Sequence, residues 1–272
     1  MIFVRDKGQM CNNILQYGHL YAWGREHGRH AVSLRFAYKY PFFHICNTRY
    51  HNFWIYTLAK YAGNWNLIPK VEFHEPDADI SKQEYIMRHS PFVVAEGWYV
   101  RFYDLFLKYK KEIIHLFAFT KKINGVVDRY LSKYGDSKSI RLGVHIRRGD
   151  YKHWMDGKYY YEDDVYIRNI KDFVKKFRGE KIDIYICGND HNLNVHRYKK
   201  EIPEACLHFP KGSAGEDLCL LSRCNYLIGP PSTFSLVASM YHDAPLYWIE
   251  NGKTSLTPDN FKSFDYLFQH IK

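Results

Sequence analysis

The second half of the chain alternates between short apolar stretches and longer amphipathic ones, and this alternation restricts the fold more than any other feature. It predicts strands at 141–147, 182–187, 206–209, 225–229 and 245–249. Helices are expected between them, at about 162–178, 191–201, 215–224 and 232–241. Strands and helices in this order form a parallel sheet with helices on both faces. Ligands of such sheets bind beyond the carboxyl ends of the strands.

The first half starts with a similar unit and then becomes less regular. A short strand at 2–4, a turn at 6–8 and a helix from about Asn12 to His27 form the unit. Further elements are expected at 50–62 (helix), 92–95 (strand), 103–117 and 120–134 (helices). The polar, turn-rich segment 133–139 is the best boundary between domains. We therefore expect two α/β domains facing a cleft, at 1–135 and 140–250, followed by a C-terminal segment at 251–272.

Composition indicates a folded protein that prefers acidic partners. The chain has 272 residues, of which 46% are hydrophobic, and a formal net charge of +10. This charge suits nucleic acid, an anionic membrane surface or a phosphorylated small molecule. The first 30 residues lack the pattern of a signal peptide, and no apolar run is long enough to span a bilayer, so we expect a cytoplasmic protein.

The six cysteines predict reduced, mostly buried thiols, because a chain of this length does not depend on disulfides. Cys219 and Cys224 could form half of a metal site. No second Cys/His pair accompanies them, so we expect no bound metal.

Polar or glycine-containing turns follow three strands of the predicted second domain. They are Arg147-Arg148-Gly149-Asp150, Gly188-Asn189-Asp190 and the stretch from Gly229 to Ser235. A helix that begins at Ser232 or Thr233 directs free backbone N–H groups toward an anion. Arginine can bind phosphate oxygens through two hydrogen bonds. Together these features describe a diphosphate site built without a metal.

Each turn also has an ordinary explanation. Ser232 and Thr233 can serve as a helix N-cap, Asn189 and Asp190 as a common turn, and Arg148 as a solvated surface charge. The functional interpretation gains weight because the three turns follow strands of one parallel sheet, whose carboxyl ends lie at one edge.

These motifs resemble those of the fucosyltransferases that share a His-x-Arg-x-Gly-Asp motif, and above all the bacterial α-1,2-fucosyltransferases of glycosyltransferase family 11. The opening Gly8-Gln9-Met10-Cys11-Asn12-Asn13-Ile14-Leu15-Gln16-Tyr17 is similar to the family's Gly-Gly-Leu-Gly-Asn-Gln-Leu-Phe-Gln-Tyr, with Gln9 and Cys11 in place of glycines. The family's His-x-Arg-Arg-Gly-Asp-Tyr runs from His145 to Tyr151. Its later motifs resemble Gly188-Asn189-Asp190, the stretch from Asp217 to Cys224 and the stretch from Ser232 to Ser235, the last preceded here by Gly229-Pro230-Pro231.

The resemblance implies a fold of the GT-B type, with two Rossmann-like domains, and an inverting fucosyltransferase. The donor would be GDP-fucose, and neither a metal nor another cofactor would be required. The acceptor would be a hydroxyl, O2 of galactose, on an oligosaccharide or lipid-linked glycan. Peripheral association with the inner face of a membrane is a further expectation, supported by the basic surface.

The resemblance also assigns roles to individual residues. Arg147 would stabilise the departing diphosphate, with His145 and the hydroxyls of Ser232 and Thr233 as helpers. The other expected donor-binding residues are Gly8, Asn12, Arg148, Asp190, Asp217 and Phe234. For Asp190 the alternative is an N-cap for the helix at 191–201. The alternation of the strand places Arg147 on the face of His145 and Arg148 on the opposite face, so Arg148 should matter less.

An inverting transfer also favours a base, and Asp150 and Asp156 are the carboxylates nearest the arginines in sequence. The alternative for Asp150 is a turn residue that pairs with an arginine. Asp77-Ala78-Asp79 has the spacing of a manganese motif. It lies in a polar loop that contains proline, and we interpret it as surface.

Two other classes of function remain open. A nucleic-acid-binding protein is suggested by the charge and the 24 tyrosines, but the aromatic residues cluster in apolar stretches and no recognition motif appears. A sugar-nucleotide-binding protein without catalysis is the other, and the replacements at Gln9 and Cys11 keep it open.

Overall fold

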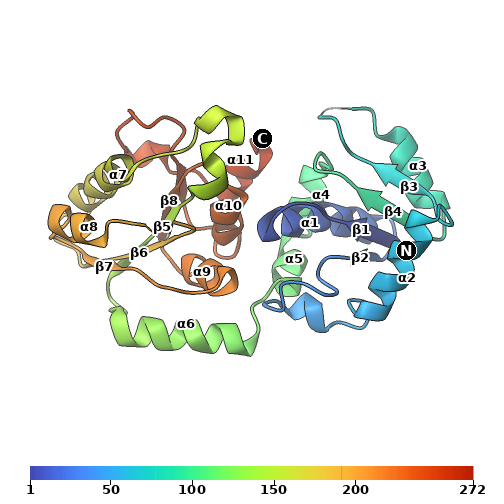
Figure 1. The fold of residues 1–272 in the computed structure, drawn as a ribbon, viewed down its shortest axis with the longest axis horizontal. Coiled ribbons are helices and arrows are strands. Elements are labelled where there is room, and N and C mark those ends of the chain that lie inside the picture. Colours follow the sequence, from blue (N-terminus) through green and yellow to red (C-terminus); the bar gives the residue numbers. More distant parts are fainter. Residues whose placement is uncertain (77, 191, 272) are drawn as a thin grey trace. The chain divides into compact units, whose positions relative to one another are not determined.

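The computed structural model describes residues 1–76, 78–190 and 192–271. The chain forms two compact units, Met1–Thr120 and Lys121–Lys272 (Figure 1). Each is an α/β unit around a parallel sheet, as the alternation in the sequence predicts.

The first unit is built on a sheet with the strand order β2-β1-β4-β3. Its parallel strands are β1 (Ile2–Arg5), β2 (Ala31–Ser33), β3 (Lys70–Glu72) and β4 (Val93–Glu96). Its helices are α1 (Met10–Glu26), α2 (Phe53–Asn64), α3 (Ser81–His89), α4 (Tyr103–Lys108) and α5 (Lys110–Leu116), with a 3-10 turn η1 (His44–Asn47). Phe3 pairs with Val32 on one side and Val94 on the other, which fixes the register of the central strand.

The second unit contains a parallel sheet with the order β7-β6-β5-β8-β9. The strands are β5 (Ile140–Ile146), β6 (Ile182–Gly188), β7 (Cys206–His208), β8 (Tyr226–Gly229) and β9 (Leu246–Trp248). The helices are α6 (Lys121–Tyr134), α7 (Asp163–Lys176), α8 (Val195–Glu201), α9 (Ala214–Leu221), α10 (Thr233–Met240) and α11 (Phe264–Gln269). Short 3-10 turns lie at η2 (Gly149–Lys152), η3 (Trp154–Gly157) and η4 (Pro258–Asn260).

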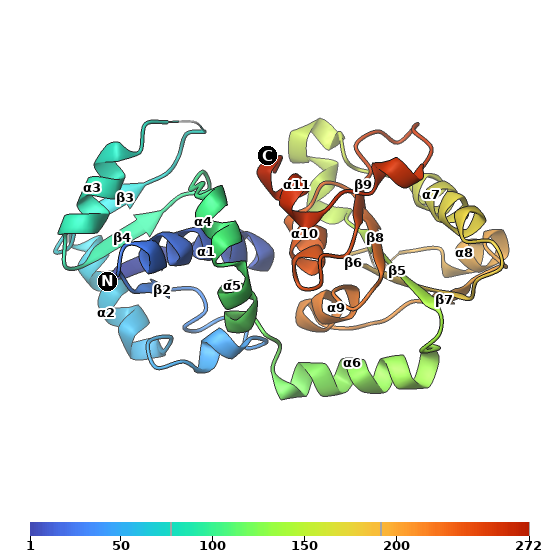
Figure 2. The ribbon, with the colours of Figure 1, turned by 180° about the vertical axis from the view of Figure 1, so that it is seen from behind.

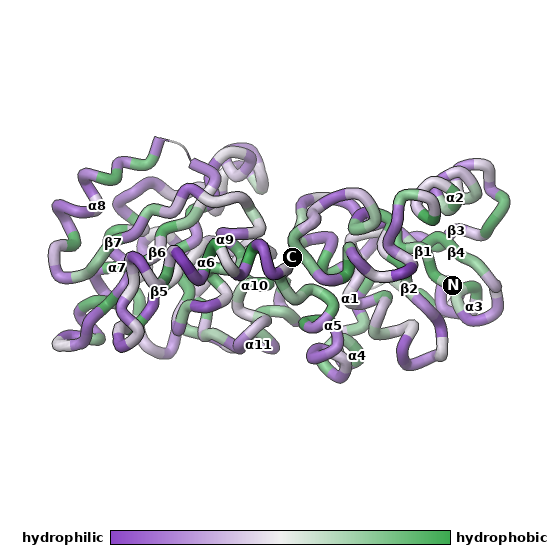
Figure 3. Tube along the Cα trace, turned by 90° about the horizontal axis from the view of Figure 1, so that it is seen from below, coloured by the Kyte–Doolittle hydropathy of each residue, from purple (hydrophilic) through white to green (hydrophobic). Residues whose placement is uncertain are grey.

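Alternate residues of β5 face the two helical layers of this unit. Val144 belongs to the buried cluster that includes Tyr166 of α7 and Tyr198 of α8. Gly143 faces the other way, where an added Cβ would lie 2.7 Å from the Leu221 side chain of α9. Helices α7 and α8 therefore cover one face of the sheet, and α9 and α10 cover the other. Figure 3 shows that α8 is mostly hydrophilic.

The strand order creates a topological switch point between β5 and β8. From β5 the chain proceeds outward through β6 and β7, and then returns to add β8 and β9 on the other side. Connections on the two sides leave in opposite directions, so a crevice forms where β5 and β8 end. These are the strands that the His-x-Arg-x-Gly-Asp motif and the stretch from Gly229 to Ser235 follow.

The division of the chain differs from the predicted one. The first unit ends at Thr120 and the second begins at Lys121, before α6, whereas the expected boundary lay after this helix. Helix α6 packs on α9, and Asp128 pairs with Arg223 just beyond α9. The segment after 250 also belongs to the second unit, because Leu246 and Lys262 form a β-bridge and α11 packs beside α10 (Figures 1 and 2). A polar turn at 133–139 therefore marks a helix end within a unit.

None of the helices in the described ranges has both the length and the apolar character needed to cross a bilayer. No disulfide joins the described cysteines, and four of the six are buried.

Candidate functional site

The turn after β5 gives the two arginines different surroundings. The Arg147 side chain is 21% exposed, and its guanidinium donates to the Asp150 carboxylate at 2.8 Å. The Arg148 side chain is only 9% exposed and forms ion pairs with Asp163 at 2.6 Å and Asp190 at 2.5 Å. Its Nε atom also donates to the Tyr161 carbonyl. Arg148 therefore faces α7, opposite to His145, as the alternation predicts.

The position of Asp190 rules out the alternative in which it caps a helix. Helix α8 begins at Val195, and its N-cap is Asn194, whose side chain accepts the backbone N–H of Arg197. Asp190 instead pairs with Arg148 and accepts the backbone N–H of Asn192. Asn189 supports the same turn, because its side-chain oxygen accepts the backbone N–H of Arg148 at 2.9 Å.

His145 is a buried, neutral ring. It stacks on Phe234 of α10, with 4.8 Å between ring centroids and 25° between planes. Burial, together with the charge of Arg147, lowers the His145 pKa to about 3. Its Nδ1 atom is buried and has no hydrogen-bond partner among the described residues. At neutral pH His145 is therefore uncharged, and its ring can still donate or accept a hydrogen bond.

Tyr151 joins the turn after β5 to the turn after β8, a contact for which sequence analysis proposed no role. Its hydroxyl donates to the Pro231 carbonyl at 2.6 Å, and the Arg147 guanidinium carbon lies 5.7 Å from its ring centroid. Burial raises the Tyr151 pKa to about 12, so the phenol stays a donor. The sequence does contain a signal, since Tyr151 ends the quoted motif. This tyrosine therefore links the turn that carries Arg147 to the turn that precedes α10.

Helix α10 begins directly after the turn that follows β8. Ser232 is its N-cap, and the Ser232 hydroxyl accepts the backbone N–H of Phe234 at 3.2 Å. Thr233 is the first residue of the helix. The predicted helix start is confirmed. The backbone N–H groups of the first turn and the positive end of the helix dipole lie at the switch point, where they favour an anion.

Asp217 lies on α9 and reaches the end of β6. The Cys187 thiol hydrogen-bonds to its carboxyl group, and the other contacts leave Oδ1 buried without a hydrogen-bond partner among the described residues. Burial, and secondarily the nearby Glu216, raises the Asp217 pKa to about 7. Buried carboxylate oxygens normally have partners, so an empty one marks a position where a ligand donor would be favourable.

Both candidate bases, Asp150 and Asp156, are exposed. The Asp150 side chain is 56% exposed and pairs with Arg147. Asp156 is exposed in η3 with a positive φ of 56°. The pairing of Asp150 matches the turn-residue alternative.

In the first unit, the loop between β1 and α1 is tightly held. Gly8 has a φ of +90°, and an added Cβ would lie 2.7 Å from the Asn12 side-chain nitrogen. Gln16 clamps the loop: its amide donates to the Lys7 carbonyl at 2.7 Å and its oxygen accepts the Lys7 N–H at 3.1 Å. Gln9 stands at the N-cap without a side-chain hydrogen bond, and Cys11 is buried. Gln16 is thus a positioning residue that the sequence interpretation missed.

A cavity of about 260 Å³ lies beside the carboxyl ends of β1 and β2. Its lining residues are Arg5, Asp6, Leu34, Arg35, Tyr38, Tyr56, Lys60 and Asn64. Asp6 is buried, accepts the Ser33 hydroxyl at 2.9 Å, and has its pKa raised to about 7 by burial. Tyr38 and Tyr56 pack together with ring centroids 4.5 Å apart. The cavity offers cations and aromatic surface side by side.

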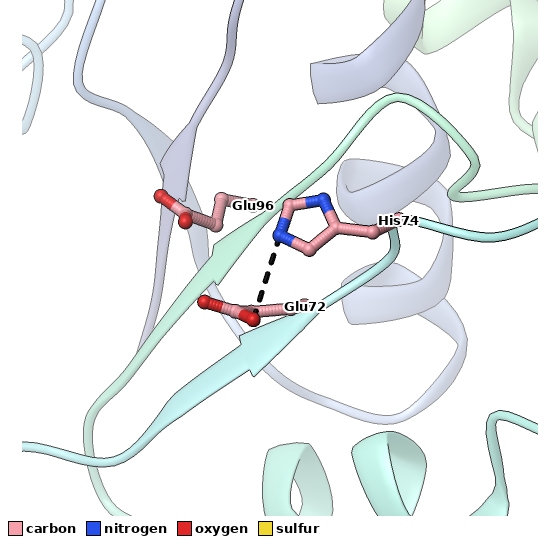
Figure 4. Close-up of side chains that lie close together, drawn as sticks. All are labelled: Glu72, His74 and Glu96. Carbon is pink, nitrogen blue, oxygen red and sulfur yellow. Dashed lines mark ion pairs between the residues drawn. The ribbon is translucent and has the colours of Figure 1, made fainter.

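A group of possible metal ligands, Glu72, His74 and Glu96, lies near the ends of β3 and β4 (Figure 4). The Lys70 ammonium already contacts both carboxylates, at 2.9 Å from Glu96, and Lys7 lies 3.5 Å from Glu96. These cations satisfy the carboxylates as a metal would, so the group needs no further ion. Of the Asp-x-Asp motif, Asp77 lies outside the described residues, and Asp79 is exposed and accepts the Ser81 backbone N–H at 2.9 Å.

Most of the chain is similar to known glycosyltransferases. The family model of glycosyl transferase family 11 matches residues 4–244. Galactoside alpha-(1,2)-fucosyltransferase 2 of Gorilla gorilla gorilla is 24% identical over 261 residues, which are 90% of this chain and 70% of that protein.

Solved structures show the same fold at low identity. A variant of FUT1 from Arabidopsis thaliana in complex with GDP has a TM-score of 0.64, with 13% identity, 96% of this chain and 73% of that chain covered. NodZ from Bradyrhizobium, a fucosyltransferase, has a TM-score of 0.57, with 14% identity, 93% and 96% covered. POFUT1 in complex with GDP-fucose has a TM-score of 0.57, with 11% identity, 91% and 96% covered.

The fold is thus of the GT-B type, and the family match makes the chain a glycosyltransferase. The chain belongs to glycosyl transferase family 11, a family of fucosyltransferases, and the predicted resemblance is confirmed.

Proposed function

We propose that this protein transfers L-fucose from GDP-fucose to a galactose hydroxyl, O2, with inversion at the anomeric carbon. The observation that carries the proposal is the contact made by Tyr151. It joins the turn after β5, which carries Arg147, to the turn that precedes α10. Complexes of FUT1 with GDP and of POFUT1 with GDP-fucose support the choice of donor.

In this mechanism the acceptor oxygen attacks the anomeric carbon while the bond to the β-phosphate breaks. Negative charge then develops on the leaving GDP. Arg147 would donate two hydrogen bonds to that diphosphate, and the N–H groups at the start of α10 would share the charge. Groups fixed in advance stabilise a transition state at little cost of reorganisation, and losing one such contact costs about 3 kcal/mol.

Arg148 would act through the loop rather than on the substrate. Its three polar partners lock the backbone from which Arg147 projects. In the donor-binding set, Ser232 and Thr233 lie at the helix start, and Phe234 stacks on His145, keeping that ring in place. Asp217 would receive a hydroxyl or N–H of the guanosine on its unpartnered oxygen.

The first unit would supply the acceptor side and the loop of Gly8 and Asn12. The cavity beside β1 and β2 suits a glycan, since sugars stack on tyrosine rings and hydrogen-bond to charged groups. Tyr38, Tyr56 and Asp6 are the residues we propose to contact the acceptor.

Asp150 remains our proposed base, released from Arg147 when the diphosphate takes over that guanidinium. Binding of the donor would thus free the carboxylate that deprotonates the acceptor hydroxyl.

The proposed reaction uses protein cations in place of a metal. We predict that transfer persists in excess EDTA, because Arg147 and the start of α10 supply the positive charge at the diphosphate. The assay is GDP release from GDP-fucose with a β-galactoside acceptor, followed by linkage analysis of the product. Loss of activity in EDTA with recovery in manganese would contradict the metal-free mechanism.

The same assay separates the alternatives. A sugar-nucleotide-binding protein without catalysis would bind GDP-fucose and yield no transferred fucose with any glycan tested. A nucleic-acid-binding protein would neither bind GDP-fucose nor transfer fucose. Transfer to a position other than O2 would retain fucosyl transfer and reject the proposed linkage.

A further inference from the structure

Helix α2 exposes an apolar surface that the fold does not need. Its inner side already packs on the first sheet, where Ala59 joins a cluster with Phe3, Val32 and Val94. Its outer side nevertheless carries Trp54, Leu58, Tyr61 and Trp65, spaced by four, three and four residues. This spacing places them on one stripe of the helix. The helix is therefore apolar both on its buried side and on this exposed stripe.

These outer side chains are strongly exposed. We call them, with their two neighbours, the aromatic face: Phe53, Trp54, Leu58, Tyr61, Trp65 and Leu67, which are 59%, 76%, 71%, 45%, 68% and 70% exposed. Two pairs of their rings pack together: the centroids of Tyr61 and Trp65 lie 5.4 Å apart, and those of Phe53 and Trp54 lie 6.3 Å apart. Contiguous apolar surface of this kind marks a binding site in a folded protein.

The charges around the aromatic face indicate what covers it. From Arg49 to Lys70 the sequence has no aspartate or glutamate. Lys60 extends its ammonium over the rings of Tyr56 and Tyr61, at 5.7 and 5.8 Å from their centroids. An apolar strip with tryptophan and tyrosine, bordered by cations, is typical of helices that lie in the interface of an anionic bilayer. Two copies meeting face to face would instead oppose like charges.

We propose that α2 docks the protein on the surface of an anionic membrane, with the aromatic face inserted among the lipid headgroups. Trp54, Leu58 and Trp65 enter the boundary of the acyl chains, and Tyr61 keeps its hydroxyl at the headgroups. Arg49 and Lys60 contact the phosphates. The helix lies in the plane of the membrane and does not cross it. This docking does not rest on the chemistry proposed above, although Lys60 also lines the cavity proposed for the acceptor.

Vesicle sedimentation tests the proposal with the full chain. Vesicles of phosphatidylcholine with about a quarter phosphatidylglycerol are compared with phosphatidylcholine alone. The protein should bind the anionic vesicles more tightly, and added salt should weaken that binding. Trp54→Ser combined with Leu58→Ser should lower the vesicle affinity by about tenfold or more. The matched control is Tyr266→Ser, which removes an aromatic ring that is 50% exposed in the second unit.

Circular dichroism checks that each variant is folded, which is expected because the altered side chains are on the surface. Equal vesicle binding by the double variant and the parent protein would overturn the proposal. So would a parent protein that ignores vesicles but forms a dimer in sedimentation equilibrium, with the double variant monomeric, because the aromatic face would then be an interface between copies.

Discussion

Arg147 and Arg148 are neighbours in the sequence, yet one is available to a ligand and the other is part of the scaffold. The buried Arg148 holds Asp163 and Asp190 together, and removing a partner from a buried ion pair leaves a charge without compensation. Arg147 has one carboxylate partner among the described residues, the mostly exposed Asp150. The two residues should therefore fail in different ways when they are replaced.

Arg147→Lys should reduce turnover by about a hundredfold while the melting temperature stays near that of the parent. Lysine keeps the charge but cannot form two parallel hydrogen bonds with the diphosphate. Steady-state kinetics of GDP release measure the turnover, and differential scanning calorimetry measures the melting temperature.

The matched control is Arg148→Met, which should destabilise the fold by about 3 kcal/mol because two buried carboxylates lose their cation. If Arg147→Lys keeps normal turnover, or if Arg148→Met is as stable as the parent, the assignment of the two roles is wrong.

Asp217 gives the stability of the protein a dependence on pH. Its carboxyl ionises with a pKa of about 7 in the folded chain and 3.8 as its ordinary value. Between these values the folded state holds the proton more tightly, so this residue's contribution to the free energy of unfolding falls as pH rises. Above about pH 7 both states are ionised, and the loss is complete.

Asp217→Asn should remove this dependence. Relative to the parent, the variant should gain stability from about pH 4 to pH 7, with no further gain at higher pH. Urea unfolding at several pH values measures the difference, and the exposed Asp259→Asn serves as control. A difference that is constant across this range would show that Asp217 is not buried as described.

At the scale of single residues, the sequence predicted the features that follow from strand alternation and from motifs. The opposite orientation of the two arginines follows from a period of two, and the N-cap at Ser232 follows from its residue type. The partners of Arg148 were not predictable, since Asp163 and Tyr161 reach it through a loop whose path the sequence does not specify. The clamp by Gln16 was missed for the same reason: a glutamine within a helix has no typical partner.

Among the elements, the loop from β1 to α1 depends on the backbone of Gly8. A positive φ disfavours any side chain, whether or not there is space for it. Gly179, between α7 and β6, has a similar φ of +97° with nothing within 4 Å of an added Cβ. The two glycines therefore separate backbone strain from the local contact with Asn12.

Both Gly8→Ala and Gly179→Ala should lose about 1 kcal/mol of stability through this strain. Only Gly8→Ala should also raise the Michaelis constant for GDP-fucose, because the alanine methyl displaces the Asn12 side chain from the loop. Thermal unfolding and donor titrations measure the two effects. An equal rise of the donor constant in both variants would remove the Gly8 loop from the proposed site.

Elements with a clear period were predicted to within a few residues, whereas three elements of the first unit were not predicted. Strand β3 is Lys70-Val71-Glu72, with one apolar side chain, and β2 is equally short. Such strands are defined by their pairing with β4 and β1, which no local pattern reports. Helix α3 is polar and buries only Met87, so its hydrophobic signal is weak.

For the whole molecule, the position of α6 has a consequence for fragments. Ile123, Val127 and Leu131 of this helix are buried, and the helix packs on α9 within the second unit. We predict that a fragment of residues 121–272 folds cooperatively and binds GDP. A fragment that starts at 136 exposes the surface of α9 and should be markedly less stable.

Circular dichroism melting and calorimetric titration with GDP compare the two fragments. Equal stability would restore the boundary at 133–139 that the sequence favours. The sequence could not distinguish these divisions, because an amphipathic helix shows that it has a buried side without showing which unit covers it.

The order of the second sheet also bears on how the protein is made. Central β5 pairs with β8, more than eighty residues later in the chain, and β8 in turn pairs with β9. During synthesis the first unit, complete at Thr120, can fold while the rest is still emerging. The second unit cannot complete its sheet until β8 and β9 have been synthesised. Until then, one edge of β5 stays unpaired on the nascent chain. Slow translation between β5 and β8 would lengthen the time in which that edge is vulnerable to aggregation.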